Sequence, residues 1–446
     1  MARKRPLTSA AEDRKDKTVT DVGLENLIST RTRSSDLKIT DIRIAKLEGV
    51  PMRHTIIRID TNQGLVGWGE ARDQSSATFV LMLKARLIGE NPCNVEMLFR
   101  KIRQFGGPGR QGGGVSGIEM ALLDLAGKAY DIPAYMLAGG KYRDEILTYA
   151  DTESRPDPEE MGRTLLARQA QGFEMVKMDI GLSLIWDVPG AVIARPRERS
   201  RHPKDLPFTM HPFTGTHITP IGVEYIADYV RRVRDVVGYS LPIAADHFGY
   251  MDVDSCIRLG RALEPYALEW LEDMIPWQFT QQWRQLTESI ATPTCTGEDI
   301  YLAEGFKPLL DAQAIRVAHP DPASAGGILE TKKIGDLAQG YGVPMALHLA
   351  ATPIATMACV AIGASTENFL ALEFHAADVP DWSDLVTGLP NPIIQNGHIT
   401  VPDAPGLGFG DINEEAFLKR IDSKDSGFFE PTPQWDAEWN YDRQWG

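Results

Sequence analysis

Between residues 147 and 375 the sequence alternates short apolar segments with amphipathic helical segments. Strands are predicted for LTYADT, MVKMDI, PIAADH, LEWLED, PTCTGE, IRVAHP, PMALHL and FLALEF. Because strands and helices alternate, they should form right-handed βαβ units in a parallel sheet. Eight such units predict a closed (β/α)8 barrel of the TIM type. This repeat constrains the fold more than any other feature of the chain.

The regions that flank the barrel are predicted to form a smaller domain. Residues 37–146 contain strand-like segments around an Asn-Gln-Gly turn and then a helical pattern, so they predict an α+β capping domain. Residues 376–446 are irregular and rich in proline, and we expect them to return to this cap. Residues 1–36 are polar and predict a disordered tail. Residues 182–220 form a long insertion in the barrel, with a lid, an oligomer contact and surface decoration as the alternatives.

Composition limits the partners of the chain. The formal net charge of -15 argues against nucleic acid or an anionic membrane as the main partner. It does not exclude a small anionic substrate, because a bound metal ion can reverse the local sign of a site. The four cysteines show no CxxC spacing and no apolar run is long enough to span a bilayer. We therefore expect a cytoplasmic protein, and we expect it to be a homo-oligomer.

Titratable side chains lie at or near the ends of the predicted strands from the second onward. They are Lys177, Asp246, Glu272, Glu298, Asp321, His348 and Glu373. From Asp246 onward they are 23 to 27 residues apart, about the length of one βα unit. All should therefore lie on the C-terminal rim, where barrel enzymes carry out their chemistry. A single carboxylate there can equally be a helix cap. Three in consecutive units would repel one another without a cation, and an all-oxygen set suits Mg²⁺ better than Zn²⁺.

The sequence around these positions contains five characteristic segments. They are AADHFG, LEWLEDMIP, TGEDI, HPDPASAGGILETKKI and ALH. In this order they resemble the mandelate racemase/muconate lactonizing branch of the enolase superfamily, over roughly residues 38–410. The resemblance implies a barrel with an α+β cap made from both ends of the chain, and Mg²⁺ bound by Asp246, Glu272 and Glu298. It also implies a small carboxylate substrate, whose α proton is removed while the metal stabilises the enediolate.

One position departs from the family pattern. Related enzymes often carry Lys-x-Lys after the second barrel strand, and this chain has Lys177-Met178-Asp179. Lys177 can still neutralise a substrate carboxylate, but an acid replaces the lysine that serves as the base on one face. The base on the opposite face is retained as His348, which Asp321 would orient. Because racemisation needs competent groups on both faces, the departure favours dehydration.

The resulting hypothesis is a Mg²⁺-dependent dehydratase of a sugar acid such as an aldonate. His348 would remove the α proton, and loss of the β-hydroxyl would give a 2-keto-3-deoxy acid. His348 would also serve as the acid if the elimination were syn. Two alternatives stay open. One is an epimerase, racemase or cycloisomerase that uses the same intermediate, and the other is a binding or regulatory homologue without turnover.

Other residues are candidates for contact with the substrate. The resemblance implies this role for Glu373, with a structural cap as the alternative. His247 adjoins Asp246, where packing is the alternative to acid catalysis. The resemblance places Arg53 and His54 in a substrate-contacting loop, with a solvated hairpin as the alternative. In the insertion, the candidates are Trp186, His211 and His217, with a surface position as the alternative. Asp179 is kept as a substrate contact. His319 should share the face of Asp321 and is predicted to belong to an interior packing layer.

Overall fold

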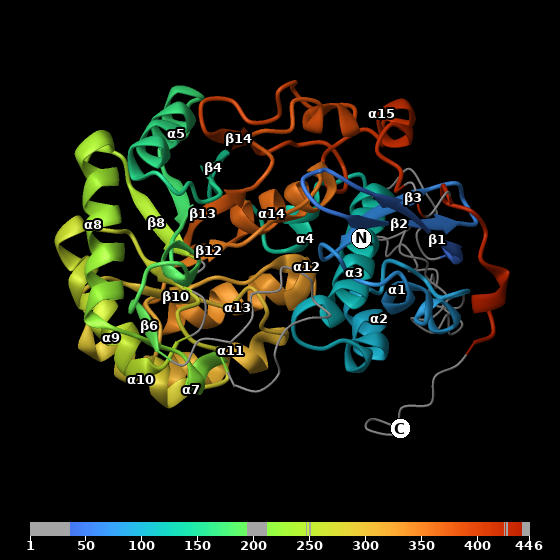
Figure 1. Cartoon of the computed structure of the whole chain (residues 1–446). Coiled ribbons are helices and arrows are strands. Elements are labelled where there is room, and N and C mark those ends of the chain that lie inside the picture. The colour runs from blue at the N-terminus through green and yellow to red at the C-terminus, as the bar shows by residue number, and fades with distance from the viewer. Residues whose placement is uncertain are drawn as a thin grey trace, which may run out of the picture.

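The computed structural model describes residues 36–193, 212–246, 248, 251–422, 424 and 427–438. Predictions for the first 35 residues, for His211 and for His247 lie outside this part of the chain. Figure 1 shows a barrel on one side and a smaller sheet with its helices on the other.

The barrel has the strands that the alternating pattern predicted. They are β4 (Glu145–Ala150), β5 (Val176–Asp179), β8 (Ile243–Asp246), β9 (Leu271–Glu272), β10 (Thr294–Thr296), β11 (Val317–Ala318), β12 (Met345–Leu347) and β13 (Phe369–Phe374). Each strand pairs in parallel with the next one, and β13 pairs with β4. The last pairing closes the sheet, so the prediction of a closed barrel is confirmed.

Helices connect the barrel strands and cover their outer surface. The longer ones are α5 (Pro158–Ala170), α8 (Pro220–Val237), α9 (Val253–Leu263), α10 (Thr280–Ser289), α11 (Leu302–Asp311), α13 (Ile328–Gly340) and α14 (Pro353–Ser365). Helix α8 is typical, since it buries Ile226, Val230 and Val233 along one face. Its N-cap residue Thr219 accepts a hydrogen bond from the backbone N–H of Gly222. Helix α14 is buried on all sides.

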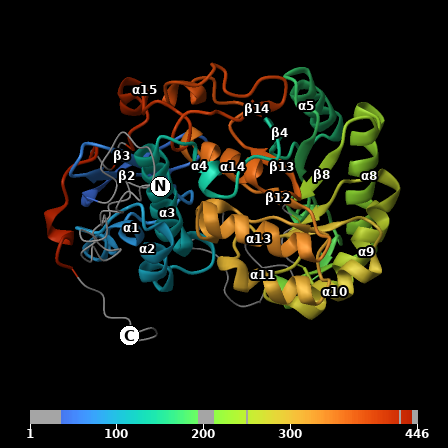
Figure 2. The ribbon, with the colours of Figure 1, turned by 180° about the vertical axis from the view of Figure 1, so that it is seen from behind.

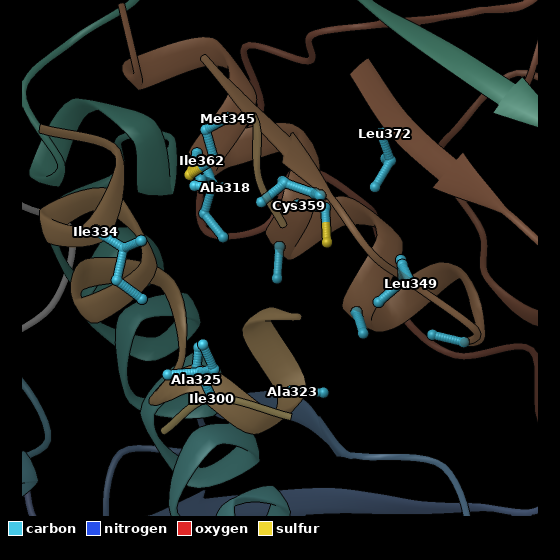
Figure 3. Close-up of a cluster of buried hydrophobic side chains, with 14 of the residues drawn as sticks. Ile300, Ala318, Ala323, Ala325, Ile334, Met345, Leu349, Cys359, Ile362 and Leu372 are labelled. Carbon is cyan, nitrogen blue, oxygen red and sulfur yellow. The ribbon is translucent and has the colours of Figure 1, made fainter. Parts of the chain in front are cut away.

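Apolar side chains fix α13 and α14 against the neighbouring strands. Figure 3 shows this cluster, in which Ile334 of α13 and Ile362 of α14 lie near Met345 of β12. All three side chains are fully buried. Burial of one such side chain contributes roughly 1.5–3 kcal/mol. The packing holds the strands rigidly, and with them the side chains at their C-terminal ends.

The cap is an antiparallel sheet covered by helices. Strands β1 (Ile39–Leu47), β2 (His54–Thr61) and β3 (Val66–Ala71) pair in sequence order. Helix α3 (Gly113–Tyr130) lies between this sheet and the barrel in both views (Figures 1 and 2). A Cβ atom on Gly69 would lie 2.0 Å from the carbonyl oxygen of Gly117, so the helix backbone rests directly on β3.

Shorter elements complete the two parts. They are α1 (Thr78–Leu81), α2 (Val95–Ile102), α4 (Ala134–Leu137), α6 (Leu182–Ile185), β6 (Val192–Ile193), α7 (Pro212–Gly215), β7 (His217–Ile218), α12 (Pro322–Ala325), β14 (His398–Thr400) and α15 (Glu414–Leu418). Strands β6 and β7 pair within the insertion. No helix in the described part of the chain has the length and apolar character needed to cross a membrane.

The C-terminal segment joins both parts of the molecule. Strand β14 pairs antiparallel with barrel strand β4. Further along, Ile421 and Phe428 form β-bridges with Leu47 and Ala45 of the cap strand β1. The predicted fold, a barrel with an α+β cap made from both ends of the chain, is therefore confirmed.

Two buried cap carboxylates fasten the cap to the barrel. Glu70 of β3 accepts hydrogen bonds from the backbone N–H groups of Thr352 and Ala355, at the start of α14. Glu119 of α3 accepts them from Ile328 and Leu329, at the start of α13. Each carboxylate satisfies N–H groups that a helix leaves unpaired at its N-terminus. The cap is thus held against the rim by specific polar contacts as well as by apolar packing.

Candidate active site

Three carboxylates meet at the C-terminal rim, as the spacing predicted. Asp246 and Glu272 end β8 and β9, and Glu298 follows β10 by two residues. One oxygen from each lies within 4.8 Å of the others. Asp246 and Glu272 are buried and Glu298 is partly exposed. Carboxylates this close fit a divalent cation with a preference for oxygen ligands.

Two other triplets in the described residues have similar spacing. They are Glu272, Cys295 and His319, and His348, Glu373 and His375. Both contain sulfur or nitrogen donors, which suit softer metals than Mg²⁺. We assign no metal to them. The all-oxygen triplet is therefore the candidate metal centre.

Lys177 lies among the rim carboxylates. Its Nζ is 3.0 Å from Oδ2 of Asp246, 3.1 Å from Oε1 of Glu272 and 2.5 Å from Oε1 of Glu373. Burial lowers the pKa of this lysine, but the three carboxylates outweigh burial and raise the pKa well above its ordinary value. Lys177 therefore remains a cation at any working pH.

The predicted His348–Asp321 pair forms in the structure. Nδ1 of His348 is 2.8 Å from Oδ2 of Asp321, and Nε2 is 3.1 Å from Oε2 of Glu298. The other oxygen of Asp321 accepts a hydrogen bond from the backbone of Ala323, because Asp321 caps the short helix α12. The histidine is thus oriented by one carboxylate, and it touches the candidate metal centre through another.

Among the charges around His348, that of Glu298 has the largest effect on the pKa of the imidazole. Burial lowers the pKa of the imidazole, yet the Glu298 carboxylate and its neighbours raise it to about 10. A cation held by Glu298 would offset that negative charge and return the imidazole towards its neutral form. The base form of His348 and the occupancy of the metal centre are linked through this one carboxylate.

A fully buried polar layer lies below the metal centre. Nδ1 of His319 is 3.1 Å from Oε1 of Glu272, and Nε2 is 2.8 Å from the hydroxyl of Tyr149. Tyr149 also donates a hydrogen bond to Oε2 of Glu373. His319 does lie in the interior, but it contacts a candidate metal ligand instead of packing only against apolar groups.

Arg72 is a site residue that the sequence analysis missed. It directly follows cap strand β3, and its side chain is almost fully buried. Nη1 donates to Oδ2 of Asp321 at 2.6 Å, and Nη2 donates to Oε1 of Glu298 at 3.0 Å. The available signal was local: the charged pair Arg72-Asp73 ends an apolar strand.

His375 and Asp151 were also missed. His375 lies 3.2 Å from Asp151 through Nδ1 and 3.0 Å from Glu373 through Nε2. Both residues carried a signal in the sequence. His375 is two positions after Glu373, on the same rim, and Asp151 is the next-to-last residue of the first predicted strand segment.

The structure places several predicted substrate contacts elsewhere. His54 is only 1% exposed, with Nδ1 2.8 Å from a carboxylate oxygen of Glu70, so here it belongs to the cap core. Arg53 is half-exposed and forms an ion pair with Asp422 at 2.9 Å.

Trp186 packs against the apolar core. In the insertion, Nδ1 of His217 is 2.8 Å from Asp252. By contrast, Asp179 ends β5 in register with Asp246 and does lie on the rim.

Comparison with known families agrees with this architecture. Residues 28–139 match the mandelate racemase/muconate lactonizing enzyme N-terminal domain, and residues 160–416 match the enolase C-terminal domain-like family. The chain belongs to the enolase superfamily, in its mandelate racemase/muconate lactonizing branch.

Individual relatives point to one type of reaction. The chain is 34% identical to a D-xylonate dehydratase of Haloferax volcanii, over 88% of this chain and 91% of the relative. It is 27% identical to a D-galactonate dehydratase of Ralstonia nicotianae, over 86% and 94%. Among solved structures, a mandelate racemase/muconate lactonizing enzyme-like protein from Rubrobacter xylanophilus matches with a TM-score of 0.76 and 30% identity, over 89% of this chain and 100% of that one. The protein is thus a hydro-lyase of this superfamily.

Proposed function

We propose that the protein is a Mg²⁺-dependent dehydratase that converts a sugar acid into a 2-keto-3-deoxy acid. One observation carries the proposal: Glu298 of the carboxylate triplet is 3.1 Å from the His348 imidazole, which Asp321 orients. A metal ligand and a base therefore meet at the same point of the rim. The relatives that act on D-xylonate and D-galactonate support an aldonate as substrate.

The metal would be held by Asp246, Glu272 and Glu298. When bound, it would act as a Lewis acid and stabilise the negative charge that develops on the substrate carboxylate. Mg²⁺ is favoured because all three ligand groups offer oxygen. Burial raises the pKa of Glu272, but His319 and Lys177 outweigh burial and hold that pKa at about 2, so this ligand is ionised at neutral pH.

The chain's own residues would carry the proton chemistry. Nε2 of His348 would take the α proton, while Asp321 holds Nδ1 as the N–H donor and so fixes the tautomer. Lys177 would add a permanent positive charge beside the substrate carboxylate. Asp179 occupies the position of the second family lysine, which leaves the opposite face without that base and disfavours racemisation.

Incubation with a library of aldonates tests the proposal. With Mg²⁺, at least one aldonate, with D-xylonate and D-galactonate tried first, should yield a 2-keto acid detected with semicarbazide. The variant His348→Asn should bind Mg²⁺ but form no product. If wild type exchanges the α hydrogen with deuterium from D₂O but forms no keto acid, an epimerase or cycloisomerase replaces this proposal. If it does neither, the protein is a binding or regulatory homologue.

Two expectations about partners accompany this proposal. A small carboxylate, and not a macromolecule, should be the ligand of the rim. The enzyme should also be a homo-oligomer. Size-exclusion chromatography with light scattering tests the second expectation, because a monomer of this chain has a mass of 49.3 kDa.

A further inference from the structure

A second histidine lies at the rim beside His348, and the dehydration described above leaves its role open. His375 directly follows β13, and its ring centroid is 5.8 Å from that of His348. The His375 side chain keeps 14% of its surface exposed, whereas that of His319 keeps none. Part of the His375 ring is therefore open to a substrate bound at the same rim.

Both ring nitrogens of His375 face carboxylates. Nδ1 is 3.2 Å from Oδ2 of Asp151, at the end of β4, and Nε2 is 3.0 Å from Oε1 of Glu373, on β13. Such neighbours favour the doubly protonated imidazolium, in which each nitrogen donates. Burial lowers the pKa of His375, but the two carboxylates outweigh burial and raise the pKa, against the opposing charge of Lys177 from β5. His348, on the β12 side, is the remaining titratable ring in contact.

We propose that His375 is the general acid of the reaction, a role that rests on the dehydration proposed above. His348 takes the α proton, and the electron pair of that C–H bond first enters the substrate carboxylate as an enediolate and then becomes the new carbon–carbon double bond. The bond from the β carbon to oxygen breaks with its electron pair on oxygen, and the proton of His375 completes a water molecule. On tautomerisation of the enol, His348 returns its proton to the β carbon and His375 recovers one from the enol oxygen. The products are one keto acid and one water, and both histidines end in their starting states.

Neighbouring groups are poorer proton donors than His375. Lysine is ordinarily a weaker acid than imidazolium, and Nζ of Lys177 lies within 3.1 Å of three carboxylate oxygens that favour its charged form. Burial raises the pKa of Glu373, but Lys177 and the histidines lower it well below the ordinary value, so Glu373 has no proton to give. Tyr149 is fully buried, which raises its pKa well above the ordinary value, and it exposes no surface to a substrate at the rim. Of these groups, His375 carries a proton and is also a side chain that ordinarily titrates near neutral pH.

The test compares two leaving groups. The β-hydroxyl of a sugar acid that the enzyme dehydrates needs a proton to depart, whereas fluoride at the same carbon leaves without one. We expect His375→Asn to lower kcat for the hydroxyl substrate by on the order of 10²–10⁴-fold. The same variant should eliminate fluoride from the 3-deoxy-3-fluoro analogue at a rate within about threefold of wild type. It should also still exchange the α hydrogen with deuterium, because His348 is intact.

Matched variants separate an acid from a structural residue. His348→Asn should lose activity on both the hydroxyl and the fluoro substrate. Retained fluoride elimination by His375→Asn would show that this variant is folded. The role of His375 as general acid is overturned if His375→Asn loses activity on both substrates equally. It is also overturned if this variant dehydrates the sugar acid as fast as wild type does. It is also overturned if His247→Asn, and not His375→Asn, shows the selective loss. A wild type that forms keto acid from no sugar acid overturns the proposed function itself, before any variant is compared.

Discussion

Arg72 of the cap and Asp321 of the barrel are joined by a 2.6 Å hydrogen bond from Nη1 to Oδ2, the carboxylate oxygen that also lies 2.8 Å from Nδ1 of His348. The other terminal nitrogen of Arg72 donates to Glu298, which in turn contacts Nε2 of the same histidine. The four side chains form a closed ring. A residue from one domain thereby positions both the base and a candidate metal ligand of the other.

Replacing Arg72 by Lys should lower kcat about 10- to 100-fold without unfolding the protein. Lysine keeps the charge, but it lacks the planar fork that contacts Asp321 and Glu298 simultaneously. KM should change little, because Arg72 acts through those two carboxylates. Steady-state kinetics and the melting temperature provide the measurement. Arg58→Lys is the control, since Arg58 is a partly exposed cap residue paired with Asp60. Unchanged kcat in Arg72→Lys would contradict a positioning role.

The barrel could be predicted because the pattern of strand and helix segments repeats along the sequence. Each βα unit places a residue at the rim, so Asp246, Glu272, Glu298 and His348 could be assigned to one face from their spacing alone. Arg72 lies in the cap, outside this repeat. It reaches the rim through the docking of a separate domain, and spacing along the chain does not encode that contact.

The burial of His54 could not be predicted from the sequence either. This residue lies where the family resemblance places a substrate-contacting loop, which suggested a role in recognition. The structure pairs it with Glu70, whose carboxylate caps α14, and buries both side chains completely. A partner 16 residues further along the chain, on an adjacent strand, decides whether a histidine is exposed. That pairing becomes visible only when the register of β2 and β3 is known.

Replacing Asp151 by Asn should shift the alkaline limb of kcat/KM for the hydroxyl substrate to lower pH, on the order of one pH unit. A general acid must be protonated, so activity falls as the pH rises through the pKa of His375. The Asp151 carboxylate raises that pKa, and its removal lowers it. The limb should not move for the fluoro analogue, which needs no acid. Glu153→Gln, at an exposed residue nearby, is the control. If the alkaline limb does not shift in Asp151→Asn, the Asp151 carboxylate does not set the pKa of the catalytic acid.

Removal of the metal should abolish turnover and lower the melting temperature. A cation that binds only the folded state stabilises it by RT ln(1 + [L]/Kd), about 2.7 kcal/mol at 100 times Kd. Differential scanning fluorimetry with EDTA and then with added Mg²⁺ measures the shift. Glu298→Gln should reduce the Mg²⁺-dependent rise, whereas Glu304→Gln, at an exposed residue of α11, should keep it. An equal rise in both variants would place the ion elsewhere.

Glu119→Gln should become more stable than wild type as the pH rises from 5 to 9. Burial raises the pKa of Glu119 from 4.5 to about 8, and the N–H groups of Leu329 and Ile328 only partly oppose burial. A carboxyl group whose pKa is raised in the folded state favours folding fully below its unfolded pKa. That contribution is lost as the pH rises through about 8.

Urea unfolding at several pH values measures the difference in the free energy of unfolding between Glu119→Gln and wild type. The glutamine side chain of the variant cannot ionise, so this difference should grow with pH by a few kcal/mol at most. Glu153→Gln, at an exposed residue outside the cap, should show a flat difference. A flat difference for Glu119→Gln as well would mean that the two backbone N–H groups hold the carboxylate ionised in the fold. The contact between α3 and α13 would then be a charged helix cap at every pH at which the enzyme works.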